Sequence, residues 1–182
     1  LNSKNINFIG AGVSGGSKGA RFGPSIMPGG NKNSYEIVRP IFESAAAKVN
    51  GSPCVAYMGN SSSGHYVKMI HNGIEYAMMQ LISESYDLLK NGLKRKNEEI
   101  HDIFFKWNET TLNSYLIEIT KDIFSKKDTD TDNHMVDMIL DKAKQKGTGK
   151  WTSQSAMDLG INIPTIDSSV SMRIISSFKN QR

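Results

Sequence analysis

The stretch that decides the fold of this chain is GHYVKMIHNGIEY, residues 64–76. When it is wound as an α-helix at about 100° per residue, five polar side chains share one face, because they are spaced three, four, seven and eight positions after the first. These side chains belong to Lys68, His71, Asn72, Glu75 and Tyr76. The other sides of the helix are largely apolar, which is typical of a buried helix. A polar stripe on a buried helix should line a ligand, a partner or water.

The stripe carries residue types that suit acid–base chemistry. A lysine that is desolvated or close to other cations loses its proton more easily, so Lys68 could act as a base. A partly buried glutamate can hold a proton, so Glu75, two helical turns away, could act as an acid. His71 and Asn72 could orient ligand hydroxyls between them. The alternative is a polar seam between helices in which Lys68 and Glu75 are solvated charges, and it must explain why the polar groups share one side.

A glycine-rich segment, residues 10–30, comes before this helix. It opens with GAGVSG, residues 10–15, which matches the G-x-G-x-x-G pattern of dinucleotide-binding sites. Such a site needs a helix to open at the third glycine, whereas the residues up to 30 hold several more glycines and two prolines. We therefore interpret the segment as a loop whose bare backbone N–H groups and Ser14 hydroxyl approach an anionic ligand.

A second loop, QKGTGKWT at residues 145–152, is similar in part to the P-loop of nucleotide-binding proteins. It lacks the upstream glycine, and Trp151 stands where the P-loop has Ser or Thr, so ATP binding is not expected. Two interpretations are equally good on the residues alone. The loop is either a turn that presents Lys146, Thr148 and backbone N–H groups to a phosphate, or a turn that starts a helix with Thr152 as its cap.

The sequence predicts no bound metal. Residues 128–132 begin like an EF-hand calcium loop, but the sixth and twelfth positions are Asn133 and Ile139 in place of Gly and Glu. The four histidines lack the spacing of zinc ligands. We therefore expect a solvated loop at residues 126–134.

Three blocks of this chain together resemble the family of decarboxylating 6-phosphogluconate dehydrogenases. Residues 64–76 resemble the catalytic helix of the family, residues 13–30 its substrate loop and the segment after it, and residues 145–152 its phosphate loop. The blocks have the order and spacing of the family. The resemblance implies oxidation of 6-phosphogluconate at C3 with NADP, followed by loss of CO2 to give ribulose 5-phosphate and NADPH. This is a step of the pentose phosphate pathway and of gluconate utilisation.

The resemblance also implies a role for each matching residue. Lys68 would take the proton of the C3 hydroxyl, and Glu75 would protonate C1 of the enediol. The residues implied to hold the substrate carboxylate and hydroxyls are Ser14, Gly15, Gly16, His71 and Asn72, and those implied to hold the 6-phosphate are Tyr76, Lys146, Thr148 and Arg173. No metal is needed in this family. One departure is that Ser17 and Lys18 stand where the family commonly has acidic residues.

We expect a mainly α chain: the end of an α/β, Rossmann-type NADP-binding domain at residues 1–60, then the first part of an all-helical domain at residues 61–182. The chain begins at Leu1 and ends at Arg182 directly after a helical pattern, so we expect a piece of a longer protein that is inactive by itself and lacks the main cofactor fingerprint. The expected strands are 5–9, 25–27 and 54–58. The expected helices are 16–22 (one turn), 35–48 capped by Ser34, 64–91 ended by Gly92, 96–107, 111–125, 135–143, 152–159 and 165–180.

Composition narrows the class of protein and its partners. The chain has 182 residues with 38% hydrophobic and 22% charged, and a net charge of +4, which suits small phosphorylated ligands better than nucleic acid. No apolar run is long enough to cross a membrane. Cys54 is the single cysteine, which favours a cytoplasmic protein without internal disulfides. By family resemblance we expect a homodimer through the helical domain.

Two other functions remain open on the sequence. The first is a β-hydroxyacid dehydrogenase that acts on a small unphosphorylated acid, since such enzymes share a glycine loop and a helix lysine followed by an asparagine. The presence of Lys146, Thr148, Arg173 and Glu75 together argues for a phosphorylated substrate. The second is a non-catalytic helical module for dimerisation.

Overall fold

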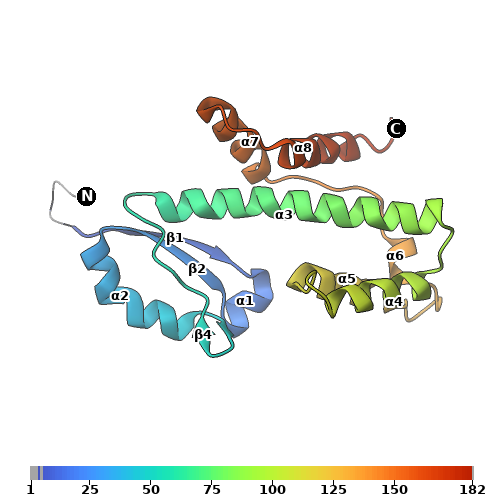
Figure 1. Cartoon of the computed structure of the whole chain (residues 1–182), viewed down its shortest axis with the longest axis horizontal. Helices are drawn as coiled ribbons and strands as arrows, with labels where there is room; N and C mark the ends of the chain where they lie inside the picture. The colour runs from blue at the N-terminus through green and yellow to red at the C-terminus, as the bar shows by residue number, and fades with distance from the viewer. Residues whose placement is uncertain (1–3, 5, 182) are drawn as a thin grey trace. The chain divides into compact units, whose positions relative to one another are not determined.

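The computed structural model describes residues 4 and 6–181 (Figure 1). It is mainly helical, as the sequence predicts. The elements in chain order are β1 (Ile9–Ser14), α1 (Gly16–Phe22), β2 (Ser25–Gly30), α2 (Lys32–Ala45), β3 (Lys48–Val49), β4 (Ser52–Pro53), α3 (Ser63–Asp87), the π-helical turn η2 (Leu88–Gly92), α4 (Asn97–Asn108), α5 (Tyr115–Ser125), α6 (Met135–Met138), α7 (Thr148–Leu159) and α8 (Pro164–Ser177). They fall into two compact units, one comprising Leu1–Ile74 with Gly147–Asn162 and the other Glu75–Lys146 with Ile163–Arg182.

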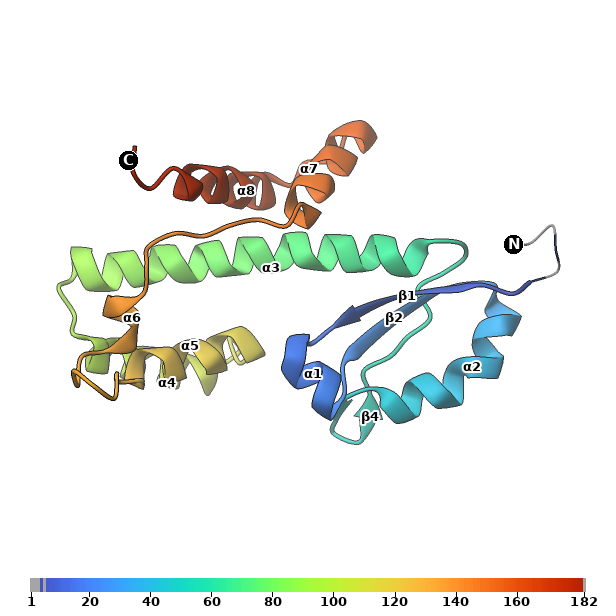
Figure 2. The same ribbon diagram turned by 180° about the vertical axis from the view of Figure 1, so that it is seen from behind.

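The first unit is built on an antiparallel hairpin. β1 and β2 pair from Ile9 opposite Gly30 to Ser14 opposite Ser25. α2 lies on one side of the hairpin and the first half of α3 on the other (Figures 1 and 2). The inner strand β2 is buried almost throughout, and Pro28 is among the most deeply buried side chains of the described residues.

Bare glycine backbone lets α3 pack unusually close to this hairpin. A Cβ added to Gly10 would lie 2.8 Å from the Nε2 atom of His65, and one added to Gly64 would collide with the main chain of both strands. A Cβ on Gly12 would likewise collide with the Cβ of Lys68 and lie 2.8 Å from the carbonyl oxygen of Gly64. Real Cβ atoms do not approach other atoms so closely, so these glycines bring the strand backbone directly against α3.

α7 crosses α3 at a second close contact within the same unit. A Cβ on Gly73 would lie 2.9 Å from the side chain of Thr152, which is 4% exposed. The Thr152 hydroxyl lies 3.0 Å from the carbonyl oxygen of Met69 and 2.9 Å from that of Thr148, within hydrogen-bonding distance of both. The crossing therefore fixes the first turn of α7 beside the middle of α3.

The second unit has two apolar clusters. In one, Ala77 of α3 packs against Ile166 and Val170 of α8. In the other, Phe104 of α4 is fully buried against Phe124 of α5, with ring centroids 5.3 Å apart. Trp107, Tyr86 and other apolar side chains of α3 to α6 surround this second cluster.

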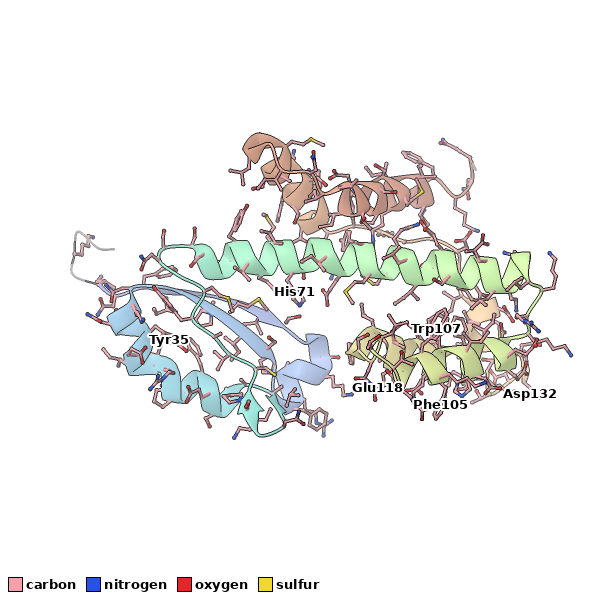
Figure 3. All side chains as sticks on the ribbon, viewed as in Figure 1. Tyr35, His71, Phe105, Trp107, Glu118 and Asp132 are labelled. Atoms are coloured by element: carbon pink, nitrogen blue, oxygen red, sulfur yellow. The ribbon has the colours of Figure 1, made fainter. Side chains whose placement is uncertain are left out.

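The helix pattern places the aromatic residues of α4 on different sides. Figure 3 shows Trp107 between α4 and the second half of α3, whereas Phe105 points away from α3. Phe105 is 46% exposed, while Trp107 stacks edge-on against Phe104 at a centroid distance of 4.8 Å. Successive residues of a helix point about 100° apart, so neighbours such as Phe104 and Phe105 end in the core and at the surface.

Several predicted elements are correct and a few are wrong at their ends. The helical turn at Gly16–Phe22 and the long helix that ends at Gly92 are confirmed, the latter as α3 continued by η2. The charged segment at residues 126–134 is a loop, as predicted, closed by a single bridge between Lys127 and His134. The helices predicted at 96–107, 111–125 and 165–180 correspond to α4, α5 and α8 within a few residues.

The first strand is shifted from its predicted place. Of the predicted strand 5–9, Asn5 lies outside the described residues, and residues 6–8 are not in a strand. β1 instead runs through the glycine-rich segment that we interpreted as a loop, and β2 extends from Ser25 to Gly30. Glycine normally weakens a strand, but here it is required by the close contact with α3, which the local sequence does not reveal.

The predicted strand at residues 54–58 is also wrong, since only Val55 forms a bridge, to Ile26. The segment still follows β2, because Ile26 donates to the Cys54 carbonyl at 2.9 Å and Met58 donates to the Pro28 carbonyl at 2.8 Å. Pro28 has no N–H to return a hydrogen bond, so a regular ladder cannot form.

Two helix starts and two helix ends differ from the prediction, since α2 ends at Ala45 rather than at 48. α2 is capped by Asn31, whose side chain accepts from the Ser34 N–H at 3.0 Å, so Ser34 is not the cap. α7 begins at Thr148 rather than at 152. The helix predicted at 135–143 ends at Met138, because the residues after it form hydrogen bonds with other elements.

Candidate functional site

Lys68 lies on the face of α3 against which β1 packs. Its stem contacts Gly12, the buried third-last residue of β1. Ser14 ends the strand two residues later, about 7 Å further at the usual rise per strand residue. Gly15 has a φ of 142° and Gly16 a φ of 56°, so the chain turns sharply there into α1. A Cβ on Gly16 would meet no described atom within 4 Å, so this turn borders open space.

The amine of Lys68 is held by two neighbours on the same helix. Its Nζ donates to the Asn72 Oδ1 atom and lies 3.3 Å from the His71 Nδ1 atom. All three side chains are half-buried. Figure 3 shows His71 projecting from α3 on the side where the hairpin lies. Three residues of the predicted polar stripe, Lys68, His71 and Asn72, thus form one hydrogen-bonded group on α3.

Thr148 joins this group from the start of α7. The Asn72 side-chain amide donates to the Thr148 hydroxyl at 3.3 Å. Gly147 precedes the helix with a φ of 105°, a value that L side chains rarely adopt, and its carbonyl oxygen accepts from Trp151 N–H at 2.9 Å. Thr152 is not the cap, because it is buried one turn inside α7. Residues 145–148 are thus a turn that starts a helix, as one of the two interpretations has it, but the cap position is occupied by Gly147 and not by Thr152.

A second group of predicted residues lies together in the second unit. The guanidinium carbon of Arg173 lies 3.8 Å from the ring centroid of Tyr76, an arrangement typical of a cation–π contact. The Tyr76 hydroxyl accepts from the backbone N–H of Lys146 at 3.3 Å. One N–H of Arg173 donates to the carbonyl oxygen of Lys144 at 2.8 Å. Tyr76, Arg173 and the backbone of Lys146 therefore lie together.

Glu75 and the Ser14–Gly16 turn remain to be placed. Glu75 is half-buried on α3, between Asn72 and Tyr76 in the sequence. It follows Lys68 by seven residues, which is a rise of about 10 Å along a helix. Ser14, Gly15 and Gly16 occupy the β1–α1 turn. The structure thus gives two hydrogen-bonded groups, each with part of its members on α3.

The sequence missed the residues that hold Lys146 and Arg173 in place. The hydroxyl of Ser176 accepts from the Ala143 N–H at 2.7 Å, and Met79 lies 3.7 Å from an N–H group of Arg173. The spacing of Arg173 and Ser176 by three residues on α8 is the signal that could have indicated a shared role.

The aspartate run is a loop stabilised by its own hydrogen bonds. The Asp128 carboxylate accepts from the N–H of Asp130 and from both the N–H and the hydroxyl of Thr131, and these hydrogen bonds lower the pKa of Asp128. Within residues 4 and 6–181, no group of three or more His, Cys, Asp or Glu side chains is arranged to hold a metal ion. In that same part of the chain, no helix is both long enough and apolar enough to span a membrane.

Comparison with protein families gives two adjacent matches. The C-terminal domain of 6-phosphogluconate dehydrogenase matches residues 64–182, and the NAD binding domain of 6-phosphogluconate dehydrogenase matches residues 1–59. Together the two matches cover nearly the whole chain.

Individual relatives agree with these matches. The decarboxylating 6-phosphogluconate dehydrogenase of Lactococcus lactis subsp. lactis is 60% identical over the whole chain, and the NADP(+)-dependent, decarboxylating enzyme of Bacillus subtilis is 59% identical. The chain spans 39% of the length of each of these relatives.

Solved structures share the fold. The Plasmodium falciparum 6-phosphogluconate dehydrogenase, described in its apo form and with NADP+ and 6-phosphogluconate, matches the whole chain with a TM-score of 0.94 and 54% identity, and the match covers 39% of that structure. A 3-hydroxyisobutyrate dehydrogenase from Salmonella typhimurium matches 95% of this chain and 55% of its own with a TM-score of 0.66 and 18% identity, which indicates a common fold only. The family matches, the relatives and the conserved geometry of the fold show that this chain belongs to the 6-phosphogluconate dehydrogenase family.

Proposed function

We propose that the full-length protein containing this chain oxidises 6-phosphogluconate with NADP and releases CO2, giving ribulose 5-phosphate and NADPH. Family membership supports the reaction, and one observation in the structure supports it most directly. The amine of Lys68 is held by Asn72 and His71 on the face of α3 that packs against β1, beside the turn that Ser14 begins. A proton acceptor next to an anion-binding turn is the arrangement that oxidation of a hydroxy acid requires.

In this proposal Lys68 takes the proton from the C3 hydroxyl while the hydride leaves C3. The same side chain then holds the proton at the new carbonyl oxygen, which draws the electrons released when the bond to the carboxyl carbon breaks. Asn72 orients the amine through its Oδ1 atom, and His71 lies within 3.3 Å of the same amine. Glu75 gives a proton to C1 of the enediol that remains after the loss of CO2. Each proton taken up or returned thus has a residue on α3.

The substrate would be held at both ends. We assign its carboxylate to the turn formed by Ser14, Gly15 and Gly16, where the bare backbone exposes N–H groups. His71 and Asn72 would contact its hydroxyls, and Thr148 would contact its 6-phosphate. The remaining residues assigned to the 6-phosphate are Tyr76, Lys146 and Arg173.

The cation–π contact and the two positive side chains support a phosphorylated substrate over a small unphosphorylated acid. Arg173 lies over the Tyr76 ring and donates to the Lys144 carbonyl and toward the Met79 sulfur, and its other N–H groups would bind anion oxygens. The phosphate of the substrate would bring negative charge to Arg173 and Lys146, which a small unphosphorylated acid lacks at that end.

NADP is the cofactor in this proposal, and it accepts the hydride when it is bound. The β1–α1 turn fits the nicotinamide end of such a molecule, because the space around Gly16 is open. We further propose that residues 1–60 are the last part of the NADP-binding domain and residues 61–182 the first part of the helical domain. A homodimer formed through the helical domain and a cytoplasmic location complete the proposal.

The test measures NADPH absorbance with the full-length protein, NADP and 6-phosphogluconate, alongside gluconate as the unphosphorylated control. Rapid NADPH formation with 6-phosphogluconate, accompanied by an equal amount of CO2, is expected. NADPH without CO2 would refute the decarboxylating step. Equal rates with gluconate would show that the cationic group at Arg173 does not select a phosphorylated substrate. The segment 1–182 alone should give no NADPH, since it spans 39% of the length of relatives with this activity.

A further inference from the structure

Residues 139–146, which we name the strap, connect α6 to the start of the α7 segment and carry Lys146. All of these residues are described, and none of them lies in a helix or a strand. Figures 1 and 2 both show this stretch running extended alongside the second half of α3, which belongs to the same unit. Ile139 and Leu140 are 61% and 65% exposed. Within the strap the Lys142 N–H donates to the Leu140 carbonyl at 2.7 Å. No helix or sheet ladder holds the segment, so contacts with other elements position it.

One side of α8 and the turn after it supply these contacts at regular intervals. Arg173 donates to the Lys144 carbonyl at 2.8 Å, and Ser176 accepts from the Ala143 N–H at 2.7 Å. Lys179 pairs with the Asp141 carboxylate at 3.3 Å. Residues 173, 176 and 179 follow one another at intervals of three, which places them along one side of a helix. They meet strap residues in reverse order, so the strap runs antiparallel to α8.

The last contact of the strap is a long one. The backbone N–H of Lys146 reaches the Tyr76 hydroxyl at 3.3 Å, which is long for an N–H···O hydrogen bond. The shorter hydrogen bonds lie upstream, at Ala143 and Lys144. The position of Lys146 therefore depends on the contacts that α8 makes with the residues before it. Ser176 and Ala143 also line the same open groove, of about 750 Å³, as Tyr76 and Arg173.

We infer that Ser176, through its hydrogen bond to Ala143, is a positioning residue that places Lys146 for the phosphate of the substrate, with Lys179 as a weaker second anchor. This inference rests on the proposed function. Ser176 touches no substrate atom and acts through the strap. The Lys179–Asp141 pair is the weaker anchor because it is solvent-exposed, with side-chain exposures of 35% and 72%.

The test compares Ser176→Ala with Ser177→Ala in the full-length protein. Ser177 is the matched control, since it is the next residue of α8 and its hydroxyl bonds only to the Ile174 carbonyl among the contacts of the described residues. Loss of one hydrogen bond to the strap should raise KM for 6-phosphogluconate about fivefold to tenfold in Ser176→Ala, with kcat nearly unchanged. The kcat/KM for gluconate should not change, because gluconate has no phosphate.

Hydrogen exchange and a second variant of Ser176 test the same inference. Hydrogen exchange of the amides at residues 142–147 should be faster in Ser176→Ala than in the wild type and in Ser177→Ala. Ser176→Thr, which keeps the hydroxyl, should restore KM. An equal loss of kcat/KM for both substrates would mean general damage and overturn the inference, as would unchanged KM and unchanged exchange. Absence of 6-phosphogluconate turnover by the wild type would instead refute the proposed function, and the exchange measurement would still decide whether Ser176 holds the strap.

Discussion

Gly12→Ala should damage both stability and catalysis, because it inserts a methyl group where β1 touches α3. The new Cβ would collide with the Lys68 Cβ and lie 2.8 Å from the Gly64 carbonyl oxygen and 3.1 Å from the Lys68 Cγ. Ordinary contacts between such atoms are about 3.5–4.0 Å. The opposing atoms are main chain and the first atoms of a side chain, so a rotamer change cannot make room. The strand must move away from the helix by roughly 0.7 Å or more to bring the 2.8 Å contact to an ordinary distance.

Overpacking of this kind typically costs about 1–3 kcal/mol, so the free energy of unfolding should fall by that amount. The same displacement moves the Ser14–Gly16 turn relative to Lys68. A misplacement of about 1 Å can lower a rate on the order of 100-fold. We therefore expect kcat/KM for 6-phosphogluconate to fall at least tenfold. Urea unfolding followed by circular dichroism and steady-state NADPH formation measure the two effects in the full-length protein.

Val13→Ala is the matched control for this experiment. Val13 is the next residue of β1, so its side chain points to the opposite face of the strand, and it is 54% exposed. Its truncation should change the free energy of unfolding by no more than about 0.5 kcal/mol. If Gly12→Ala were as stable and as active as Val13→Ala, the close packing of β1 on α3 would not be what positions the Ser14–Gly16 turn.

Two other predictions concern the second unit. Phe104→Ala removes a fully buried ring and should lower the free energy of unfolding by about 3–5 kcal/mol in urea, whereas the exposed neighbour Phe105→Ala should have a much smaller effect. The hydrogen bond from His134 lowers the pKa of Glu98. The stability that this pair adds is therefore fully present above the pKa that Glu98 has in the unfolded chain. It is lost as the pH falls through the lower pKa of the folded state. Carbon-13 NMR titration should show the Glu98 pKa rising toward its ordinary value in His134→Gln, and an unchanged pKa would contradict the assigned cause.

The helical part of the fold could be predicted because its signals are local. α3 is 25 residues long, and its polar stripe repeats with the helical period from Lys68 to Tyr76. The hydrogen bonds of Lys68 with Asn72 follow from that spacing alone, since residues four apart on a helix are neighbours. Motif resemblance then supplied roles that periodicity could not.

The parts that were predicted wrongly depend on contacts between distant segments. β1 looks like a loop because its glycines disfavour a strand, and only the approach of the α3 main chain explains why Gly12 has no side chain. The strap has enough apolar residues to suggest a helix, but its Ala143 N–H bonds to Ser176, 33 residues later in the chain. No pattern within either segment contains this information.

The most direct test of the central claim is the turnover of Lys68→Met in the full-length protein, measured together with its affinity for 6-phosphogluconate. Methionine keeps much of the apolar stem beside Gly12 and removes the amine. Because a positioned base contributes about 10²–10⁴-fold to a rate, kcat should fall at least 100-fold while the dissociation constant for the substrate changes only a few-fold. A Lys68→Met protein that binds substrate and turns it over at the wild-type rate would contradict the account.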